Sequence, residues 1–563
     1  MSVQQRRGVL GSLLVERGLL SAEELERALA EQRRSGEFIG IVLARLDILP
    51  PERALPLLAE QAGMPYVRLN DLQIPAEVLA KVPPRFASHY QLMPLAFSNG
   101  VLRIAVADPF NVQTLDELKL LLDCAVQPSL ASAKEIQEAI HRHYGVGASA
   151  VERLLDTGLH EAAPSGGGSA AEDLAAKPDD ASVISFVNQL ILSAVRDRAT
   201  DIHVEPFGQT LRLRQRIDGV MYEIPTPPEL IRLHQAVVSR IKVMAQLDIA
   251  ERRLPQDGRI KVRLDDQDLD LRISVLPTSF GEAVEVRLLS SQMLFSLPQL
   301  GLDGDHLDTL IRLIQKPHGI IFVTGPTGSG KTTTLYACLT KLNAPNVKIL
   351  TIEDPIEYQL TGITQLQVHP KIGFSFAQGL RSMLRHDPDI MMVGEVRDPE
   401  TAEITIRSAL TGHLVFSTLH TNDAAGGVTR LLDMGIEPYL VASSVLGFIA
   451  QRLVRVVCPS CKEPQPIDPA LRAEFGVTDE MPPSLWRGRG CAACKGTGYK
   501  GRTAIYEFLL LSGPIQRLVL SRGSSHEIAH AAQQTGHMRT LRQDGWRKIL
   551  QGVTTPEEVL RVT

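Results

Sequence analysis

The sequence predicts an α/β protein in which a parallel-sheet domain follows an α+β domain and a small N-terminal α/β module. An apolar run at residues 319–323 leads into a glycine-rich loop and a helical pattern, the order typical of a phosphate-binding strand, loop and helix. Residues 211–217 alternate apolar and polar side chains, which indicates a half-buried strand. Residues 9–32 and 38–61 resemble each other at an offset of 29 positions and indicate a separate repeated unit.

Length and charge narrow the class of protein. The chain has 563 residues, so the length prior suggests roughly three or four domains. A net charge of −5 argues against a general nucleic-acid binder. No run reaches the roughly 18 to 20 apolar residues of a membrane helix, and the apolar segment at residues 9–15 stops at Glu16-Arg17 without a cleavage site. We therefore expect a cytoplasmic protein that reaches a membrane only through partners.

The N-terminal module is expected to span residues 1–144. After the repeats, residues 101–107 form a candidate strand, and residues 116–122 and 133–143 form candidate helices. Residues 145–181 are rich in Ala, Gly, Ser, Pro and Asp, which predicts a flexible linker. A module on such a tether is expected to dock on a partner or to regulate.

The α+β domain is expected over residues 182–290. Its pattern predicts two helices and five strands: helices at 183–198 and 229–247, and strands at 201–205, 211–217, 259–264, 269–275 and 283–289. Asp218-Gly219 predicts a hairpin turn. Alternation places Arg212, Arg214 and Arg216 on one face. These arginines either form the solvated face of an edge strand or reach the phosphates of a nucleotide held by the next domain.

The third domain, residues 291–563, contains a loop that fits G-x-x-x-x-G-K-[ST] at every fixed position. Its glycines allow backbone N–H groups to surround the β- and γ-phosphates at the positive end of the following helix. Lys331 adds a point charge, and the Thr332 hydroxyl is placed to ligate Mg²⁺. The predicted phosphate-binding residues are Gly325, Pro326, Thr327, Gly328, Ser329, Gly330, Lys331, Thr332 and Thr333.

Carboxylates follow two later strands of this domain. The strand at residues 348–352 runs into Glu353-Asp354, and either carboxylate could hold Mg²⁺ through water or position the attacking water. The strand at 389–395 ends in Glu395, the candidate for polarising water. A third strand carries a histidine at each end, His413 and His420.

Three arginines flank the acidic strand. Arg381, Arg385 and Arg397 could neutralise phosphate charge, although a surface ion pair is the preferred interpretation for Arg381.

Four of the six cysteines form two C-x-x-C pairs separated by 29 residues. In a cytosolic chain this spacing indicates metal before disulfides, and four thiolates suit a structural, tetrahedral Zn²⁺ with no open position. The predicted ligands are Cys458, Cys461, Cys491 and Cys494, in an insert at about residues 455–505. Cys124 and Cys338 are expected to be buried apolar residues.

Several stretches together resemble the type II secretion and type IV pilus assembly ATPases. The resemblance covers residues 182–563 and is carried by residues 199–206, 255–259, 353–358, 384–398 and 411–422. It implies a RecA-like ATPase domain, a preceding PAS-like domain, the cofactors ATP, Mg²⁺ and Zn²⁺, and a ring-shaped homo-hexamer on the cytoplasmic side of the inner membrane.

The resemblance also implies roles for individual residues. Lys331 and Thr332 would hold phosphate and Mg²⁺, Glu395 would be the catalytic carboxylate and Glu353 its acidic partner. His413 and His420 would sense or position the γ-phosphate. The preceding domain would supply arginines to a nucleotide site, from among Arg212, Arg214, Arg216 and Arg259.

The leading functional hypothesis is a motor that drives pseudopilus assembly for type II protein secretion. A type IV pilus extension ATPase is the nearest alternative, and residues 428–439 and 451–455 look more like the secretion branch. A nucleic-acid translocase or conjugation motor is a hypothesis from another class, and a non-catalytic nucleotide-binding scaffold is a third.

The N-terminal repeats resemble a cyclic di-GMP-binding module found in some of these ATPases. Repeats of that module open with Arg-Leu-Gly, whereas Val9 and Phe38 occupy the arginine positions here, and Asp47 stands where a glycine is expected. Cyclic di-GMP binding is therefore not expected. We expect instead that the module docks on a cytoplasmic domain of an inner-membrane secretion or pilus platform protein.

Overall fold

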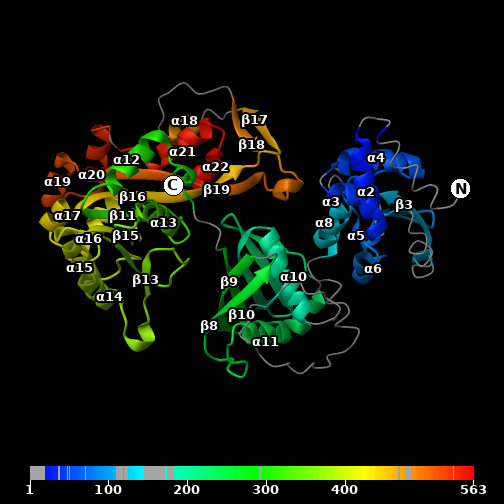
Figure 1. Cartoon of the computed structure of the whole chain (residues 1–563), viewed down its shortest axis with the longest axis horizontal. Coiled ribbons are helices and arrows are strands. Elements are labelled where there is room, and N and C mark those ends of the chain that lie inside the picture. The colour runs from blue at the N-terminus through cyan, green and yellow to red at the C-terminus, as the bar shows by residue number, and fades with distance from the viewer. Residues whose placement is uncertain are drawn as a thin grey trace. The chain divides into compact units, whose positions relative to one another are not determined.

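The computed structural model divides the chain into two compact units, residues 1–289 and 290–563 (Figure 1). The linker expected at 145–181, apart from residues 172–173, lies outside the described residues, as do the start of the first repeat and most of the helix expected at 116–122. The structure describes residues 15, 19–35, 39–46, 48–49, 51–69, 72–108, 118–119, 124–144, 172–173, 183–226, 228–264, 267–290, 295–466, 470–475, 484–536 and 538–563.

The first part of unit 1 combines short helices with a three-stranded sheet. Its described elements are α2 (Ala22–Ser35), α3 (Ile39–Arg45), α4 (Pro51–Ala62), α5 (Ala76–Leu79), α6 (Pro84–His89), β1 (Leu92–Ser98), β2 (Val101–Val106), β3 (Ala125–Leu130) and α8 (Ala133–Tyr144). Strand β2 pairs antiparallel with β1 and parallel with β3. Ser21 begins α2 with a capping box, because its hydroxyl accepts the Glu24 amide and the Glu24 carboxylate accepts the Ser21 amide. The sequence predicted β2 and α8 and missed β1 and β3.

The second part of unit 1 is an α+β fold. Its elements are β4 (Glu172–Asp173), α10 (Val183–Arg196), β5 (Ala199–Phe207), β6 (Thr210–Ile217), β7 (Val220–Ile224), η2 (Pro228–Leu233), α11 (His234–Met244), β8 (Gln256–Leu264), β9 (Gln267–Thr278) and β10 (Gly281–Ser290), and the sheet order is β4-β8-β9-β10-β5-β6-β7. Apolar side chains of α10 and α11 share one core with alternate residues of the strands, such as Leu213 and Ile260. The helix expected over 229–247 is shorter, because its first turns are 3₁₀ and Gln246, with φ 58°, closes its end.

Unit 2 is built on a parallel sheet in the order β13-β12-β14-β15-β11-β16, extended at one edge by the antiparallel strand β19. The strands are β11 (Gly319–Thr324), β12 (Ile349–Glu353), β13 (Thr364–Gln367), β14 (Ile390–Val393), β15 (Leu414–Leu419), β16 (Val445–Val457) and β19 (Tyr499–Leu510). Strand β11 is buried at every position, as expected for a parallel strand covered on both faces.

Alternate residues of β11 enter two apolar clusters, one on each face of the sheet. Ile321 and Val323 pack with α12 (Gly304–Ile314) and α13 (Lys331–Leu342), while Ile320 and Phe322 pack with helices on the opposite face. The helices of that opposite face include α14 (Phe376–Met383), α15 (Pro399–Leu410), α16 (Ala424–Asp433) and α17 (Pro438–Ser444). The C-terminal helices are α19 (Gly513–Leu520), α20 (Ser525–Gln534), α21 (Leu541–Leu550) and α22 (Pro556–Val562). The predicted fold class, in which a parallel-sheet domain follows an α+β domain along the chain, is confirmed.

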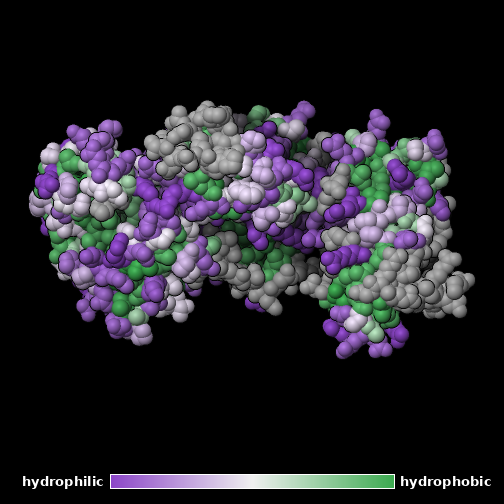
Figure 2. Space-filling view, turned by 90° about the horizontal axis from the view of Figure 1, so that it is seen from above, coloured by the Kyte–Doolittle hydropathy of each residue, from purple (hydrophilic) through white to green (hydrophobic). Residues whose placement is uncertain are grey.

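The part of the chain that the structure describes contains no candidate for a membrane-spanning helix. None of its helices combines the length and the apolar character needed to cross a bilayer. The long apolar run at residues 438–450 is divided between α17 and the buried start of β16. On the face shown in Figure 2, hydrophilic residues are interspersed with smaller apolar areas.

The close packing of α16 on β16 depends on Gly427. A Cβ atom there would lie 2.5 Å from Cδ1 of Phe448, a buried ring that stacks on Phe322 at 5.3 Å between centroids. We therefore expect Gly427→Ala to lower the free energy of unfolding by about 1–3 kcal/mol through overpacking. Scanning calorimetry should show a lower unfolding midpoint for unit 2, whereas Gly304→Ala, with open space around its added methyl, should melt like the wild type. Equal midpoints for all three proteins would contradict this packing argument.

Candidate nucleotide site and metal centre

The phosphate loop connects the end of β11 to the start of α13. Gly325, Gly328 and Gly330 have φ values of 146°, 79° and 87°, which favour glycine because other side chains would be strained. A Cβ atom at Gly325 would also lie 2.6 Å from the backbone oxygen of Gln451. The loop can therefore turn its amides toward an anion at the N-terminus of α13.

Lys331 lies folded over this loop. Its Nζ donates hydrogen bonds to the backbone oxygens of Gly325, at 2.8 Å, and Pro326, at 3.0 Å. Burial lowers the pKa of Lys331 to about 8, and the Glu395 carboxylate only partly offsets this effect. The loop therefore holds a partly desolvated cation, which favours binding of a phosphate group.

Gln451 on β16 contacts the phosphate loop and its helix, a role that was not predicted from the sequence. Its side-chain oxygen accepts a hydrogen bond of 2.7 Å from the Thr334 hydroxyl on α13, and its Nε2 lies where a Cβ atom at Gly330 would approach it to 2.7 Å. A polar residue directly after the apolar run at residues 445–450 is a signal that could have identified it, and Gln451 is indeed buried within β16.

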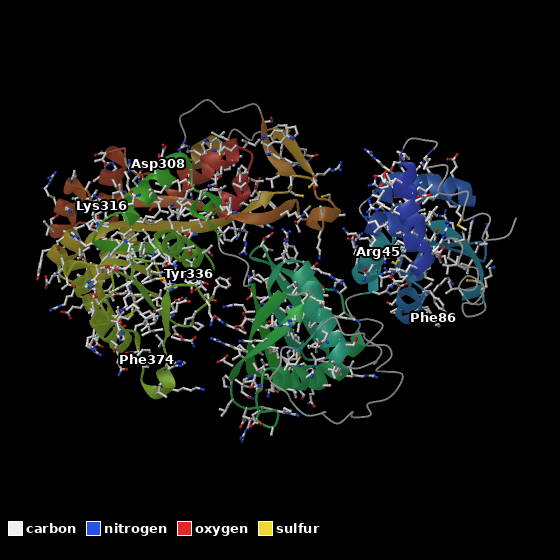
Figure 3. All side chains as sticks on the ribbon, in the orientation of Figure 1. Arg45, Phe86, Asp308, Lys316, Tyr336 and Phe374 are labelled. Carbon is white, nitrogen blue, oxygen red and sulfur yellow. The ribbon has the colours of Figure 1, made fainter. Side chains whose placement is uncertain are left out.

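Glu353, at the end of β12, is buried and fully engaged. Its carboxylate accepts hydrogen bonds from the hydroxyls of Tyr336, at 2.5 Å, and Thr351, at 2.6 Å, and from Nε2 of Gln365, at 3.1 Å. Burial raises the pKa of Glu353, although these donors oppose the shift. Since Tyr336, labelled in Figure 3, belongs to α13, this network ties β12 to the helix of the phosphate loop. The neighbouring Asp354 is exposed.

Glu395 follows β14 at the same edge of the sheet as the phosphate loop. Its Oε2 lies 2.6 Å from Nε of Arg397 and 3.3 Å from Nε2 of His420. Its charge also acts on Lys331. The structure therefore brings Lys331, Glu395, Arg397 and His420 together.

The expectation that both histidines lie beside the γ-phosphate is corrected for His413. His413 precedes β15, whereas His420 follows it, and a strand of six residues at about 3.3 Å per residue separates them by roughly 20 Å. His413 instead lies at the opposite edge of the sheet, where its Nδ1 is 2.8 Å from the backbone oxygen of Ser408. Its contacts close the turn between α15 and β15.

The other two arginines beside the acidic strand have different partners. Arg381 forms the expected surface ion pair, with Glu400 at 2.5 Å. Arg385 donates to the backbone oxygen of Arg381 and to the Ser382 hydroxyl.

The four arginines predicted in the α+β domain project from the face of the sheet opposite α10 and α11. Arg214 pairs with Glu205 at 2.7 Å, and Arg216 lies 3.6 Å from Asp201. Arg212, on β6, lies 3.9 Å from Glu223. The fourth residue is Arg259, on β8. Their reach to a phosphate stays a prediction.

The four predicted zinc ligands converge in one cluster. Their sulfur atoms all lie within 4.8 Å of one another, with Sγ···Sγ distances of 3.9 Å for Cys458 and Cys491, 3.8 Å for Cys461 and Cys494, and 3.7 Å for Cys491 and Cys494. A tetrahedron with Zn–S bonds of about 2.3 Å has edges of about 3.8 Å, so the donor set fits Zn²⁺.

Backbone amides around the cluster favour thiolates. The amide of Gly490 donates to Cys461, and those of Cys491 and Gly498 donate to Cys494. Burial raises the pKa of Cys494, but the amides of Cys491 and Gly498, together with the side chains of Cys491 and Cys461, outweigh burial and lower it to about 7. At Cys461 burial prevails over the Gly490 amide and raises the pKa to about 12. The cluster joins the end of β16 to a hairpin of β17 (Lys462–Pro466) and β18 (Ser484–Gly488).

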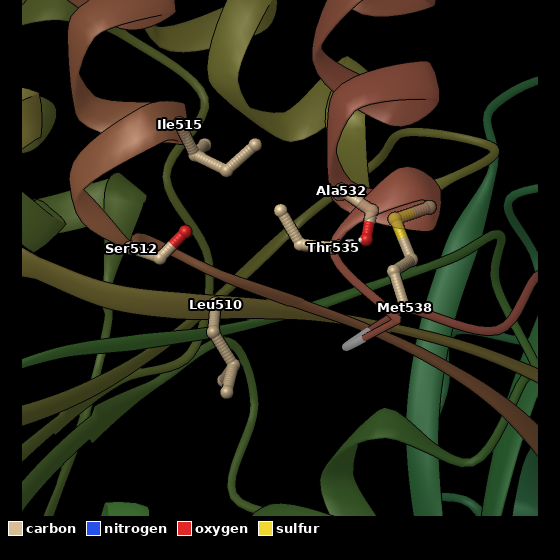
Figure 4. Close-up of a pocket in the computed structure, with 6 residues that line it drawn as sticks. All are labelled: Leu510, Ser512, Ile515, Ala532, Thr535 and Met538. Carbon is tan, nitrogen blue, oxygen red and sulfur yellow. Dashed lines mark hydrogen bonds between the residues drawn. The ribbon is translucent and has the colours of Figure 1, made fainter.

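A separate apolar cavity lies between the end of β19 and helices α19 and α20 (Figure 4). Its volume is about 170 Å³. Leu510, one of its lining residues, pairs with Gly447 near the start of β16, whereas the phosphate loop adjoins Ala450 farther along that strand. The cavity is therefore distinct from the nucleotide site. Its lining residues are Leu510, Ser512, Ile515, Ala532, Thr535 and Met538.

A phosphate loop after an internal strand of a parallel sheet, with a carboxylate at the end of β14, which is separated from β11 by β15, indicates a RecA-like P-loop ATPase. Residues 176–561 match the family model described as Type II/IV secretion system protein. The chain therefore belongs to this family. Residues 62–150 match a second model, the MshEN domain.

Two curated relatives align over nearly the whole chain. It is 45% identical to a Type II secretion system protein E from Xanthomonas campestris pv. campestris, covering 98% of this chain and 97% of the relative. It is 42% identical to the type IV pilus assembly ATPase PilB from Myxococcus xanthus, covering 98% of each. Among solved structures, it is similar to the pilus retraction motor PilT with bound ADP, with 26% identity, a TM-score of 0.45, and coverage of 67% of this chain and 96% of that one.

The cysteine cluster predicts one tightly bound zinc per chain. Elemental analysis of the purified protein should find about one Zn²⁺ per chain, and Cys491→Ser and Cys494→Ser should each lower the zinc content because one of four ligands loses its thiolate. Chelation should also make the 455–505 segment more sensitive to protease. Cys124→Ser, outside the cluster, should keep full zinc. Full zinc in both cluster variants would exclude this ligand set.

The hydrogen bonds of the buried Glu353 carboxylate predict that it stabilises the fold, whereas the exposed carboxylate of Asp354 does not. In Glu353→Gln an NH₂ group replaces one carboxylate oxygen, so it faces groups that donate hydrogen bonds to Glu353 in the wild type. The substitution should therefore lower the free energy of unfolding by about 1–3 kcal/mol. Asp354→Asn, at the adjacent exposed position, is the matched control and should have little effect. Thermal unfolding with equal midpoints for both variants would argue against the network.

Proposed function

We propose that this chain is the Mg²⁺-dependent ATPase of a hexameric motor that drives pseudopilus assembly in type II protein secretion. The observation that carries the proposal is the meeting of Lys331, Glu395 and His420 at the carboxyl edge of the parallel sheet. The likeness over nearly the whole chain to a Type II secretion system protein E supports the biological context.

Each residue of the site has its own role in the proposed hydrolysis of ATP. The loop amides and Lys331 bind the β- and γ-phosphates, and Glu395 accepts a hydrogen bond from the attacking water and orients it for in-line attack. His420, 3.3 Å from Oε2 of Glu395, holds this carboxylate and is placed to face the γ-phosphate. Mg²⁺, held by the Thr332 hydroxyl, would neutralise charge on the phosphate oxygens.

Hexamer formation gives the arginine-bearing domain its proposed role. In a ring, the exposed arginine face of one subunit meets the nucleotide of a neighbour and stabilises the charge of the transition state. Arg212 and Arg259, exposed on β6 and β8, are the candidates that this arrangement favours most.

The N-terminal module is proposed to dock on an inner-membrane platform protein and hold the motor at the cytoplasmic face of that membrane. Cyclic di-GMP is not part of the proposal, because Val9 and Phe38 lack the charge that would face its guanines and phosphates. Calorimetric titration of the full chain with cyclic di-GMP should show no binding in the micromolar range.

Type IV pilus extension is the second candidate, and the likeness to PilB favours it. The two functions are separated by complementation: the gene should restore secretion to a host lacking its type II secretion ATPase, but not pili to a host lacking its pilus extension ATPase. The reverse result would assign the chain to pili. Stimulation of the ATPase by nucleic acid at moderate salt would instead favour a translocase.

Two substitutions test the catalytic assignments. Lys331→Ala should weaken ATP binding at least about tenfold, and Glu395→Gln should lower kcat at least about 100-fold while ATP still binds. Steady-state phosphate release and binding of a fluorescent ATP analogue measure the two effects. The exposed residues Lys316 and Asp308 (Figure 3) offer matched controls, since Lys316→Ala and Asp308→Asn remove equal charges on or next to α12. Wild-type turnover in either site variant would refute the assignment.

A further inference from the structure

Arg452 lies at the edge of the sheet where the phosphate loop begins. Thr324, the last residue of β11, pairs with Ala450 of β16 on one side and with Leu419 of β15 on the other. Arg452 is two residues beyond Ala450, and Asn422 is three residues beyond Leu419. Both positions therefore lie beyond the end of β11.

A hydrogen-bonded bridge joins these two positions. Nη2 of Arg452 donates to the backbone oxygen of Asn422, at 3.3 Å, and to its side-chain Oδ1, at 3.2 Å. Since neighbouring strands lie about 4.8 Å apart, the two strands that flank β11 are separated by about 9.6 Å. The Arg452 side chain therefore spans the width of β11 beside the phosphate loop.

Much of the hydrogen-bonding capacity of this guanidinium is unused. Both bonds come from one nitrogen, and Nε is buried without a hydrogen-bond partner among the described residues. Among the residues that the structure describes, no carboxylate forms an ion pair with Arg452. In contrast, Arg397 pairs with Glu395 and Arg381 pairs with Glu400. The charge of Asp423 acts on Arg452 without an ion pair between them. A partly buried guanidinium that is not ion-paired is suited to bind an anion.

The electrostatics of the loop agree with this geometry. The positive charge of Arg452 is close enough to lower the pKa of Lys331, after the larger effect of burial. Two neighbouring cations repel each other unless an anion lies between them. A nucleotide phosphate on the loop would remove this repulsion.

We propose that Arg452 binds the terminal phosphate of ATP in its own subunit and, through Asn422, couples that phosphate to the loop that carries His420. This inference rests on the proposed ATPase function and deepens it. A planar guanidinium can donate two parallel hydrogen bonds to phosphate oxygens. ADP lacks the terminal phosphate, so Arg452 distinguishes ATP from ADP.

The coupled loop leads to more distant helices. After Asn422, Asp423 begins α16 by accepting the Gly426 amide. The amide of Ala424 donates to the buried Glu507 at 2.8 Å, and the same carboxylate accepts the Leu541 amide at the start of α21, at 3.3 Å. A shift of the Arg452–Asn422 bridge would therefore displace hydrogen-bonded groups at the N-terminal ends of α16 and α21.

Nucleotide discrimination tests the proposal. Arg452→Ala and Arg452→Gln in the full-length, zinc-loaded protein should weaken binding of the slowly hydrolysed analogue AMP-PNP about ten- to hundredfold, as expected for loss of charge-assisted hydrogen bonds. Binding of ADP should change less than about threefold. Arg452→Lys, which keeps the charge without the planar fork, should fall between the wild type and Arg452→Gln. Isothermal titration calorimetry gives both affinities, and unfolding midpoints report whether each variant is folded.

Controls separate this inference from the proposed function. Arg407→Ala removes an exposed arginine that pairs with Glu403 on α15, and it should leave both affinities unchanged. Equal losses for AMP-PNP and ADP in Arg452→Gln, or no loss for either nucleotide, would overturn the role of Arg452 even if Lys331→Ala loses nucleotide binding as expected. A wild-type protein that binds AMP-PNP through Arg452 but does not hydrolyse ATP would overturn the motor function alone. Failure of the wild type to bind either nucleotide would overturn both.

Discussion

The parallel hydrogen bonding of β11 between β15 and β16 is the constraint on which the nucleotide site depends. Because the strands run in one direction, the segments that follow them emerge at a common edge, where the phosphate loop, Glu395 and His420 meet. Residues far apart in the chain thereby become neighbours without any long-range motif. Burial of β11 on both faces holds this edge in place, since displacing the strand would expose both apolar clusters.

The edge is stabilised by polar groups that are buried and satisfied. Gln451 and Thr334 join β16 to α13, and Glu353 and Tyr336 join β12 to the same helix. Two strands of the sheet are thus bonded to α13, the helix that follows the phosphate loop. A buried polar group that loses its partner is costly, so these bonds favour one orientation of the helix.

The sequence predicted those parts of the site whose chemistry is local. The glycine-rich loop and the paired cysteines carry their spacing within a few residues, and the strands that lead to Glu353 and Glu395 could be recognised from apolar runs. Gln451 and Arg452 could not be identified in this way, because more than a hundred residues separate them from the loop and only the strand order brings them to it. The role expected for His413 was wrong for a different reason: the resemblance implied it for both histidines, although the two ends of one strand, β15, reach opposite edges of the sheet. Strands β1 and β3 were missed because each contains a proline, Pro94 and Pro128, which weakens the strand pattern.

The tetracysteine cluster lies at the ends of the two longest strands of the ATPase sheet, β16 with 13 residues and β19 with 12. A metal bound there would close the loop between the strands close to its base, so the chain beyond the cysteines would add little to the closure entropy. Insertions or deletions between β17 and β18 would then have little influence on the strand that carries Gln451 and Arg452. The cluster would allow this outer hairpin to diversify in evolution while the nucleotide edge keeps its geometry.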